Sequence, residues 1–311
     1  MRKQADHDAS HPGPGFFMFS SSFAQESFRR AREHGDHRDA FAACLSLPPM
    51  KYRLLISSLI LSTLSLQAIA ETAKSPYSLT VGGGVGFGPR FPGSKKTQFG
   101  VGPLLDFQHE SGFFASTRRG LGWGGGDEDF SFSLALAARG ERSDKARKVL
   151  GFGGGGSELT GMGKVPASAL GVFSVGGRVA NLVELGATLE LPLSHRENGR
   201  ALHLSAGVPL LQTKEDTVTL SGALHVGDGK YLRTYFGVTQ QQSTDSGYAL
   251  YTPKGGLYQA DLNLSWNHRI DTHWAVTGVV GVNRLLRDAA NSPLAGRKTA
   301  PEGGVMVTYT Y

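Results

Sequence analysis

Long stretches in which apolar and polar residues alternate recur through most of this sequence. In the segment YQADLNLSWNHRI (258–270), one set of alternate positions holds Tyr258, Ala260, Leu262, Leu264, Trp266, His268 and Ile270. The positions between them hold Gln259, Asp261, Asn263, Ser265, Asn267 and Arg269. Because successive side chains of a β-strand point to opposite faces, the pattern predicts an extended strand with one mainly apolar face and one polar face.

The predicted strands are unusually long. Residues 183–194 and 129–140 repeat the alternation over ten or more positions, about twice the ~5–6 residues of a typical strand. A tilted strand needs about 9–11 residues to cross a bilayer, so length favours a membrane setting. We count twelve candidate strands, near residues 77–89, 97–110, 112–124, 129–140, 164–180, 181–194, 199–213, 216–228, 230–243, 256–271, 273–288 and 303–311.

These strands predict an all-β fold, a transmembrane antiparallel up-and-down β-barrel. A spanning sheet must close on itself, because backbone groups in lipid have no water to bond. An even strand number is typical of a bacterial barrel with both termini periplasmic, which places the protein in the outer membrane of a Gram-negative bacterium. The alternative is a soluble β-sandwich or lipocalin-like barrel. The charged content of 19% argues against it, since soluble surfaces carry roughly 25–35% charged residues.

The chain ends on the alternating row VMVTYTY. One face of this row holds Val305, Val307, Tyr309 and Tyr311. We expect that face to contact outer-membrane lipid, with Tyr311 near the interface, where amphipathic aromatic rings are favoured. We also predict that this is the strand by which the barrel-assembly machinery inserts the protein.

A secretory signal peptide is predicted at residues 50–70. Two positive residues precede an apolar stretch of thirteen residues, and Ala68 and Ala70 supply a cleavage site before Glu71. Such a stretch makes about 20 Å of helix, too short for a bilayer core of about 30 Å. We therefore interpret residues 1–49 as a non-structural leader or misassigned start, with a genuine extension as the alternative. Residues 71–311 form the predicted barrel.

The sequence holds few candidates for chemistry. Cys44 is the only cysteine, and the histidines lack metal-ligand spacing, so no metal, cofactor or catalytic residue is predicted. The formal charge of +6, without a long basic run, excludes a nucleic-acid binder. Five charged residues are expected to form a water-bonded network in the lumen rather than a catalytic pair: Glu184, Glu190, Arg233, Asp261 and Arg269.

A glycine-rich segment separates the fourth and fifth predicted strands. Counting strands back from a periplasmic carboxyl end places residues 140–165 on the periplasmic side, where turns are normally short. We hypothesise that this segment contacts periplasmic enzymes. The same count places the separators 240–256 and 287–303 on the opposite, extracellular side.

Several motifs resemble those of one protein family. The first is Phe91-Pro92-Gly93-Ser94, although Lys95-Lys96 follow where acidic residues are common. The second is Tyr235-Phe236-Gly237. The most specific block holds Trp274, Arg284, Leu285, Asp288, Ser292 and Pro293. Together these motifs resemble the MipA/OmpV family of outer-membrane proteins over essentially all of 71–311.

The resemblance implies a non-enzymatic scaffold. The namesake of the family interacts with a membrane-bound lytic transglycosylase and a penicillin-binding protein, and thereby links murein cutting to murein synthesis. A sister branch is porin-like, so the alternative function is a channel for small solutes or antibiotics. A third, weaker alternative is a barrel that hydrolyses lipids or peptides. No catalytic residue belongs to the family pattern, and none is carried over.

Overall fold

The computed structural model describes residues 75–127, 129–145, 154–180 and 182–311. The predicted leader and signal peptide lie outside these residues. Within them, no helix has both the length and the apolar character needed to cross a membrane.

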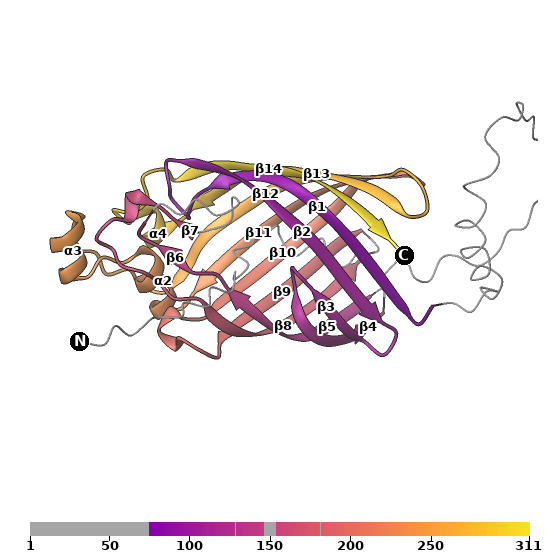
Figure 1. The fold of residues 1–311 in the computed structure, drawn as a ribbon, viewed down its shortest axis with the longest axis horizontal. Coiled ribbons are helices and arrows are strands. Elements are labelled where there is room, and N and C mark those ends of the chain that lie inside the picture. Colours follow the sequence, from indigo (N-terminus) through magenta and orange to yellow (C-terminus); the bar gives the residue numbers. More distant parts are fainter. Residues whose placement is uncertain (1–74, 128, 146–153, 181) are drawn as a thin grey trace, which may run out of the picture.

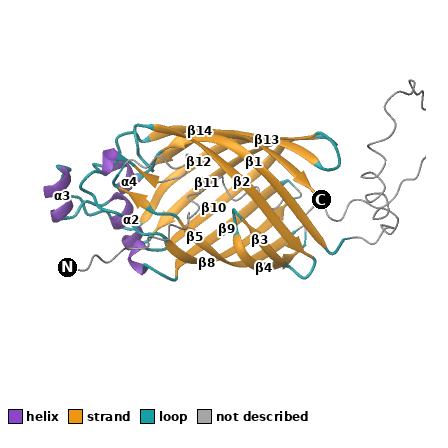
Figure 2. Cartoon of the chain, in the orientation of Figure 1, coloured by secondary structure: helices purple, strands orange, loops and turns teal. Residues whose placement is uncertain are grey.

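A single antiparallel sheet closes into a barrel (Figures 1 and 2). Each strand pairs with its neighbours in sheet order, and β1 pairs with both β2 and β14. The predicted twelve-stranded barrel is therefore confirmed. Its strands are β1 (Tyr77–Pro89), β2 (Thr97–His109), β3 (Phe113–Ser116), β4 (Gly120–Gly126), β5 (Phe130–Arg139), β8 (Ser168–Val179), β9 (Val183–Pro192), β10 (Ala201–Gln212), β11 (Asp216–Gly227), β12 (Gly256–Arg269), β13 (Trp274–Leu285) and β14 (Thr299–Thr310).

The two ends of the barrel differ. The carboxyl terminus lies at one end, and helices and short strands gather at the other, hereafter the cover end (Figure 1). The elements outside the wall are β6 (Arg142–Ser143), β7 (Gly154–Gly155), η2 (Ser157–Leu159), η3 (Arg196–Asn198), α2 (Gly229–Phe236), α3 (Gln240–Ser246) and α4 (Arg287–Asn291). Hydrogen bonds and packing described below hold these elements together.

The strand predicted over 230–243 is wrong, because this segment forms α2 and α3. The Asp228 carboxylate accepts a hydrogen bond from the Tyr231 backbone N–H and begins α2. Thr239 and Gln242 form a capping box that begins α3. Within α2, Leu232 and Phe236 are both buried. Their i, i+4 spacing suits one face of a helix as well as the alternation of a strand, and the helix caps decide between them.

The strand predicted over 112–124 is also wrong, because this segment is a short hairpin. β3 and β4 pair with each other, from Phe113 opposite Trp123 to Ser116 opposite Gly120. Gly120 has φ +87°, and a Cβ there would clash with the Leu136 carbonyl oxygen. Only glycine fits such a left-handed, crowded turn position.

The two errors cancel in the strand count but reverse the direction of every strand between them. The described residues of the segment after β5, 140–145 and 154–165, therefore lie at the cover end, opposite the carboxyl terminus (Figure 1). Contacts agree, since Gln242 donates a hydrogen bond to the Met162 carbonyl and Tyr248 to the Glu158 carbonyl. The hypothesis that residues 140–165 share a side with the carboxyl end is thus wrong.

Candidate functional site

Five charged or titratable side chains inside the barrel form a chain of contacts. Arg139 Nη2 lies 2.7 Å from Glu190 Oε2. Glu190 Oε1 lies 3.5 Å from His203 Nε2, an ion-pair contact longer than a good hydrogen bond. His203 Nδ1 lies 2.6 Å from His225 Nδ1, and His225 Nε2 lies 2.7 Å from Asp261 Oδ2. This interior chain links β5, β9, β10, β11 and β12.

Strand register produces the centre of the interior chain. His203 and His225 stand directly opposite each other on β10 and β11, and both point inward, with 7% and 6% of their surface exposed. Ala201 stands opposite Glu190, and Ala223 stands opposite Asp261. The two carboxylates therefore lie one diagonal step beyond each imidazole, within reach of its outer nitrogen.

The short contact between the imidazoles fixes the roles of their two inner nitrogens. One Nδ1 must donate and the other must accept, since two N–H groups would repel at this distance. His225 Nε2 lies within hydrogen-bond distance of Asp261. Buried His203 Nε2 has no hydrogen-bond partner among the described residues and only the longer contact with Glu190.

The hydrogen bonds of this pair lead to each other and to Asp261. No cluster of three or more histidine, cysteine or acidic side chains in the described ranges is placed to hold a metal ion. The interior chain is suited to holding strands and sharing a proton.

Helix α2 lies above the interior chain and packs on the strand ends. Its Leu232 and Phe236 form a buried cluster with Tyr258, Leu285 and Ala289, from β12, β13 and α4. Burying one such large side chain is worth about 1.5–3 kcal/mol. We call α2 together with this cluster the cover.

Two arginines connect the cover to the other side of the barrel. The Arg139 guanidinium lies 5.0 Å from the Tyr231 ring centre, a cation–π contact. Arg142 donates hydrogen bonds of 2.7 and 3.1 Å to the carbonyls of Tyr235 and Thr234, at the end of α2. Burial lowers the pKa of Arg142 to about 10. Burial also raises the pKa of Tyr231 to about 12.

Tyr258 contradicts its predicted place on the lipid face. The register between β11 and β12 shifts by one residue at this point. His225 pairs with Gln259 and Val226 pairs with Leu257, so Tyr258 is left without a partner on β11. This bulge turns the Tyr258 ring inward, where 4% of its surface is exposed and its hydroxyl lies 3.2 Å from the Tyr231 hydroxyl. A bulge redirects one side chain, so simple alternation cannot anticipate it.

The outer wall carries an apolar belt. Val305, Val307 and Tyr311 are exposed to 51%, 41% and 69%, as the predicted lipid face requires. Aromatic pairs ring the carboxyl-terminal end, including Tyr309 with Trp274 and with Tyr311 at 5.0 and 4.7 Å. Other exposed members of the belt are Phe99, Val101, Leu121, Trp123, Phe130, Leu134, Leu136, Leu262, Leu264 and Val280. An apolar belt bordered by aromatics is the outer surface of a transmembrane barrel.

Residues 81–311 match the family described as MltA-interacting protein MipA. The chain belongs to this family. No curated protein sequence matches the chain. The MipA family and the barrel architecture together support an outer-membrane location.

Among solved structures, the MipA-family barrel is similar to several outer-membrane channels. The KdgM porin is 10% identical, with a TM-score of 0.37, and the match covers 73% of this chain and 97% of that one. The NanC porin is 8% identical, with a TM-score of 0.37 and coverage of 74% and 98%. The COG4313 outer membrane channel from Pseudomonas putida F1 is 10% identical, with a TM-score of 0.36 and coverage of 78% and 98%.

Most residues of the predicted family motifs lie around the cover. Phe236 and Leu285 belong to its cluster. The Ser292 hydroxyl donates to the Phe236 carbonyl at 2.6 Å, and Asp288 accepts from the Lys254 backbone N–H. Near them are Gly93, which has φ +95° and whose carbonyl accepts from Arg297 N–H, and Ser94, which bonds to Glu158. Trp274 is the exception, at the carboxyl-terminal end, while Arg284 is exposed on β13.

The predicted lumen charges separate into different settings. Glu190 and Asp261 belong to the interior chain, whereas Glu184 pairs with Arg178 at 3.6 Å. Arg269 stands at the end of β12, and its backbone N–H donates to the Glu215 carbonyl. Arg233 lies on α2, exposed at the barrel rim, because its segment is helical.

The histidine pair was missed by sequence reasoning, although the sequence holds part of the signal. ALHLS and ALHVG occur in consecutive strands joined by a short turn. At the turn Gln212 pairs with Thr217, so a regular hairpin would place His203 opposite Val226. The register shift between Pro209 and Leu211 brings His225 opposite His203 instead.

Proposed function

We propose that this barrel is an outer-membrane docking platform for a murein lytic transglycosylase and a murein synthase of the penicillin-binding type. The family is described by its interaction with MltA, which supports a partner that acts on murein. The observation that carries the proposal is a barrel interior occupied by polar contacts beneath a cover, which suits a rigid anchor better than a wide pore.

Buried polar side chains from β2, β3 and β9–β13 support this reading of the interior. In a wide aqueous channel they would contact water, yet each is less than 9% exposed. They are Asp106, Ser116, Glu190, His203, Ser221, His225, Asn263, Asn267, Thr277 and Asn283. Several bond to one another, as Asn267 does to Thr277 at 2.8 Å. A rigid barrel would present its end loops to soluble enzymes in a fixed arrangement.

A second function, conduction of small solutes, is favoured by one feature of β1. The outward residues Val81 and Val85 alternate with Gly82, Gly84, Gly86 and Gly88, so this part of the wall sends no side chains inward.

Site-specific photocrosslinking in intact cells tests the docking proposal. Exposed Lys214 and Thr272 lie in the β10–β11 and β12–β13 turns at the carboxyl-terminal end, and exposed Gln241 lies on α3 at the cover end. Because both termini of such barrels are normally periplasmic, we expect crosslinkers at Lys214 and Thr272 to capture murein enzymes and one at Gln241 to capture none.

Purified protein in a planar bilayer provides the complementary measurement. Docking without conductance supports the platform. Steady single-channel conductance, together with no captured murein enzyme from any of the three positions, would overturn it in favour of the channel.

A further inference from the structure

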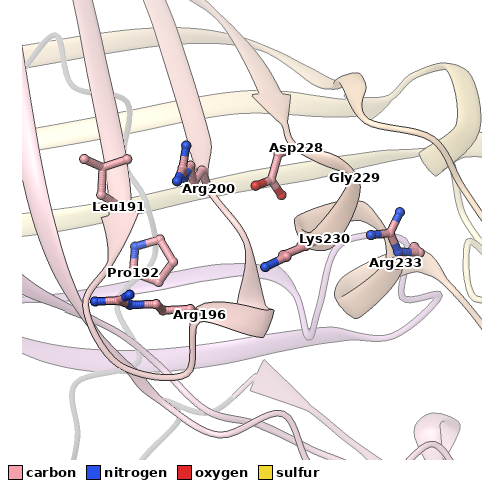
Figure 3. Close-up of a pocket in the computed structure, with 8 residues that line it drawn as sticks. All are labelled: Leu191, Pro192, Arg196, Arg200, Asp228, Gly229, Lys230 and Arg233. Atoms are coloured by element: carbon pink, nitrogen blue, oxygen red, sulfur yellow. The ribbon is translucent and has the colours of Figure 1, made fainter.

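A cationic cavity of about 670 Å³ opens at the rim of the barrel, beside the cover (Figure 3). This volume is within the range of about 300–1,000 Å³ typical of small-molecule sites. It lies between the end of β9, η3, the start of β10 and the first turns of α2. Its lining residues are Leu191, Pro192, Arg196, Arg200, Asp228, Gly229, Lys230 and Arg233.

The lining has a strong excess of positive charge. Four cationic side chains face one carboxylate, which leaves a net charge of +3. The Asp228 carboxylate is already engaged, since its Oδ1 accepts the Tyr231 N–H at 2.7 Å as the cap of α2. In the part of the chain that the structure describes, the salt bridges involve none of the four cations.

The four cations are exposed side chains gathered around one cavity, so solvent screens part of their mutual repulsion. Arg196 and Arg200 flank one side of the cavity, and Lys230 and Arg233 extend from α2 on the other (Figure 3). Like charges held around one cavity repel, and a bound anion removes that repulsion. One arginine guanidinium can bind a phosphate through two parallel hydrogen bonds, so a phosphate group suits this lining.

The position of the cavity indicates what kind of phosphate-bearing molecule it would bind. Leu191 is in the lining and also belongs to the outer wall, where 37% of its surface is exposed, with Leu193 beside it at 50%. The cavity therefore joins the apolar belt to the charged rim. A lipid has the same polarity, with acyl chains beside the wall and a charged headgroup at the rim.

We propose that this pocket binds the phosphate of a membrane lipid headgroup. Arg196 and Arg200 bind the phosphate from the η3 side, Lys230 and Arg233 bind it from α2, and the lipid chain lies along Leu191. This site is independent of the docking function, because it needs no protein partner.

Lipid binding to the purified full chain in zwitterionic detergent micelles tests the proposal, with native mass spectrometry as the readout. The probes are phosphatidic acid, phosphatidylcholine of the same chain length, and inorganic phosphate. The test variant is Arg196→Gln/Arg233→Gln. The control is Arg284→Gln/Lys298→Gln, which removes the same charge from exposed cations outside the cavity lining.

We expect the unaltered protein to retain phosphatidic acid in preference to the other two probes. The test variant should weaken that binding about ten-fold or more, because a hydrogen bond to a charged group is worth about that much. The control should bind phosphatidic acid within about two-fold of the unaltered protein. This difference is smaller than the loss of a single hydrogen bond to a charged group would cause. Circular dichroism should show the same sheet content in all three proteins.

Two results would overturn the proposal. An equal loss in the control would mean that the general positive charge of the barrel attracts the lipid. Equal binding of inorganic phosphate and phosphatidic acid would mean that the cavity takes free phosphate and that Leu191 has no part in recognition.

Discussion

Replacing His225 by phenylalanine should destabilise the barrel through loss of the interior chain. The ring fits a similar space, so the change removes hydrogen bonds more than volume. His225 makes two short contacts, 2.6 Å to His203 Nδ1 and 2.7 Å to Asp261 Oδ2. After the change, Asp261 keeps the bond of 2.8 Å from Gln259, and His203 loses the hydrogen-bond partner of its inner nitrogen.

The expected loss of unfolding free energy follows from these two contacts. The hydrogen bond to the Asp261 carboxylate contributes about 1.5–3 kcal/mol and the bond between the imidazoles about 0.5–1.5 kcal/mol, so the two together give about 2–4.5 kcal/mol. The Asp261 side chain is 6% exposed, and water therefore cannot replace the missing imidazole.

A second histidine–aspartate pair in the same barrel provides the matched control. His268 Nδ1 lies 2.9 Å from Asp216 Oδ1 on the outer wall, and the two side chains are 35% and 32% exposed. His268→Phe should leave the unfolding midpoint almost unchanged, because exposed ion pairs contribute little. Urea unfolding in detergent micelles, followed by circular dichroism of the sheet, measures both variants. Equal midpoints for His225→Phe and His268→Phe would refute the reasoning.

Three other perturbations have defined outcomes. The free energy of unfolding should fall as pH rises from about 10, where Tyr231 ionises in the unfolded chain, to about 12, its pKa in the folded protein. In urea titrations at alkaline pH, Tyr231→Phe should make this fall smaller. The same pH profile in the variant and the unaltered protein would contradict the prediction. Gly120→Ala should lower refolding yield on a gel that separates folded from unfolded barrel, because its Cβ meets the Leu136 carbonyl, whereas Gly163→Ala, with φ +74° but open space, should refold nearly normally. Arg142→Ala should speed hydrogen exchange in α2 by about ten-fold or more through loss of two hydrogen bonds, and exchange at the unaltered rate would show that packing alone holds α2.

The alternation of apolar and polar residues predicted most strands. Lipid outside the barrel and polar contacts inside it impose a two-residue period on every strand that crosses the membrane. The alternation failed where another local rule also fitted. Leu232 and Phe236 satisfy a helix and a strand equally, and the cap at Asp228 selects the helix. The turn at Gly120 divides one predicted strand into two.

The candidate site was only partly predictable for a different reason. His203 and His225 lie in one hairpin, so the sequence places them near each other, but their direct pairing depends on the register shift between Pro209 and Leu211. Arg139 meets Glu190 across β8, since β5 and β9 are not neighbours in the sheet. Such a contact depends on barrel curvature and side-chain length, which alternation does not describe.

The cover also constrains the order in which the protein can assemble. Arg142 and Tyr235 are 93 residues apart in the chain, and the four strands β8 to β11 lie between them. Their hydrogen bond can form only after those strands have paired and brought the two segments to the same end. In a partly assembled barrel α2 would therefore not yet be held in the cover. Protease cleavage near α2 would then identify barrels whose assembly is incomplete.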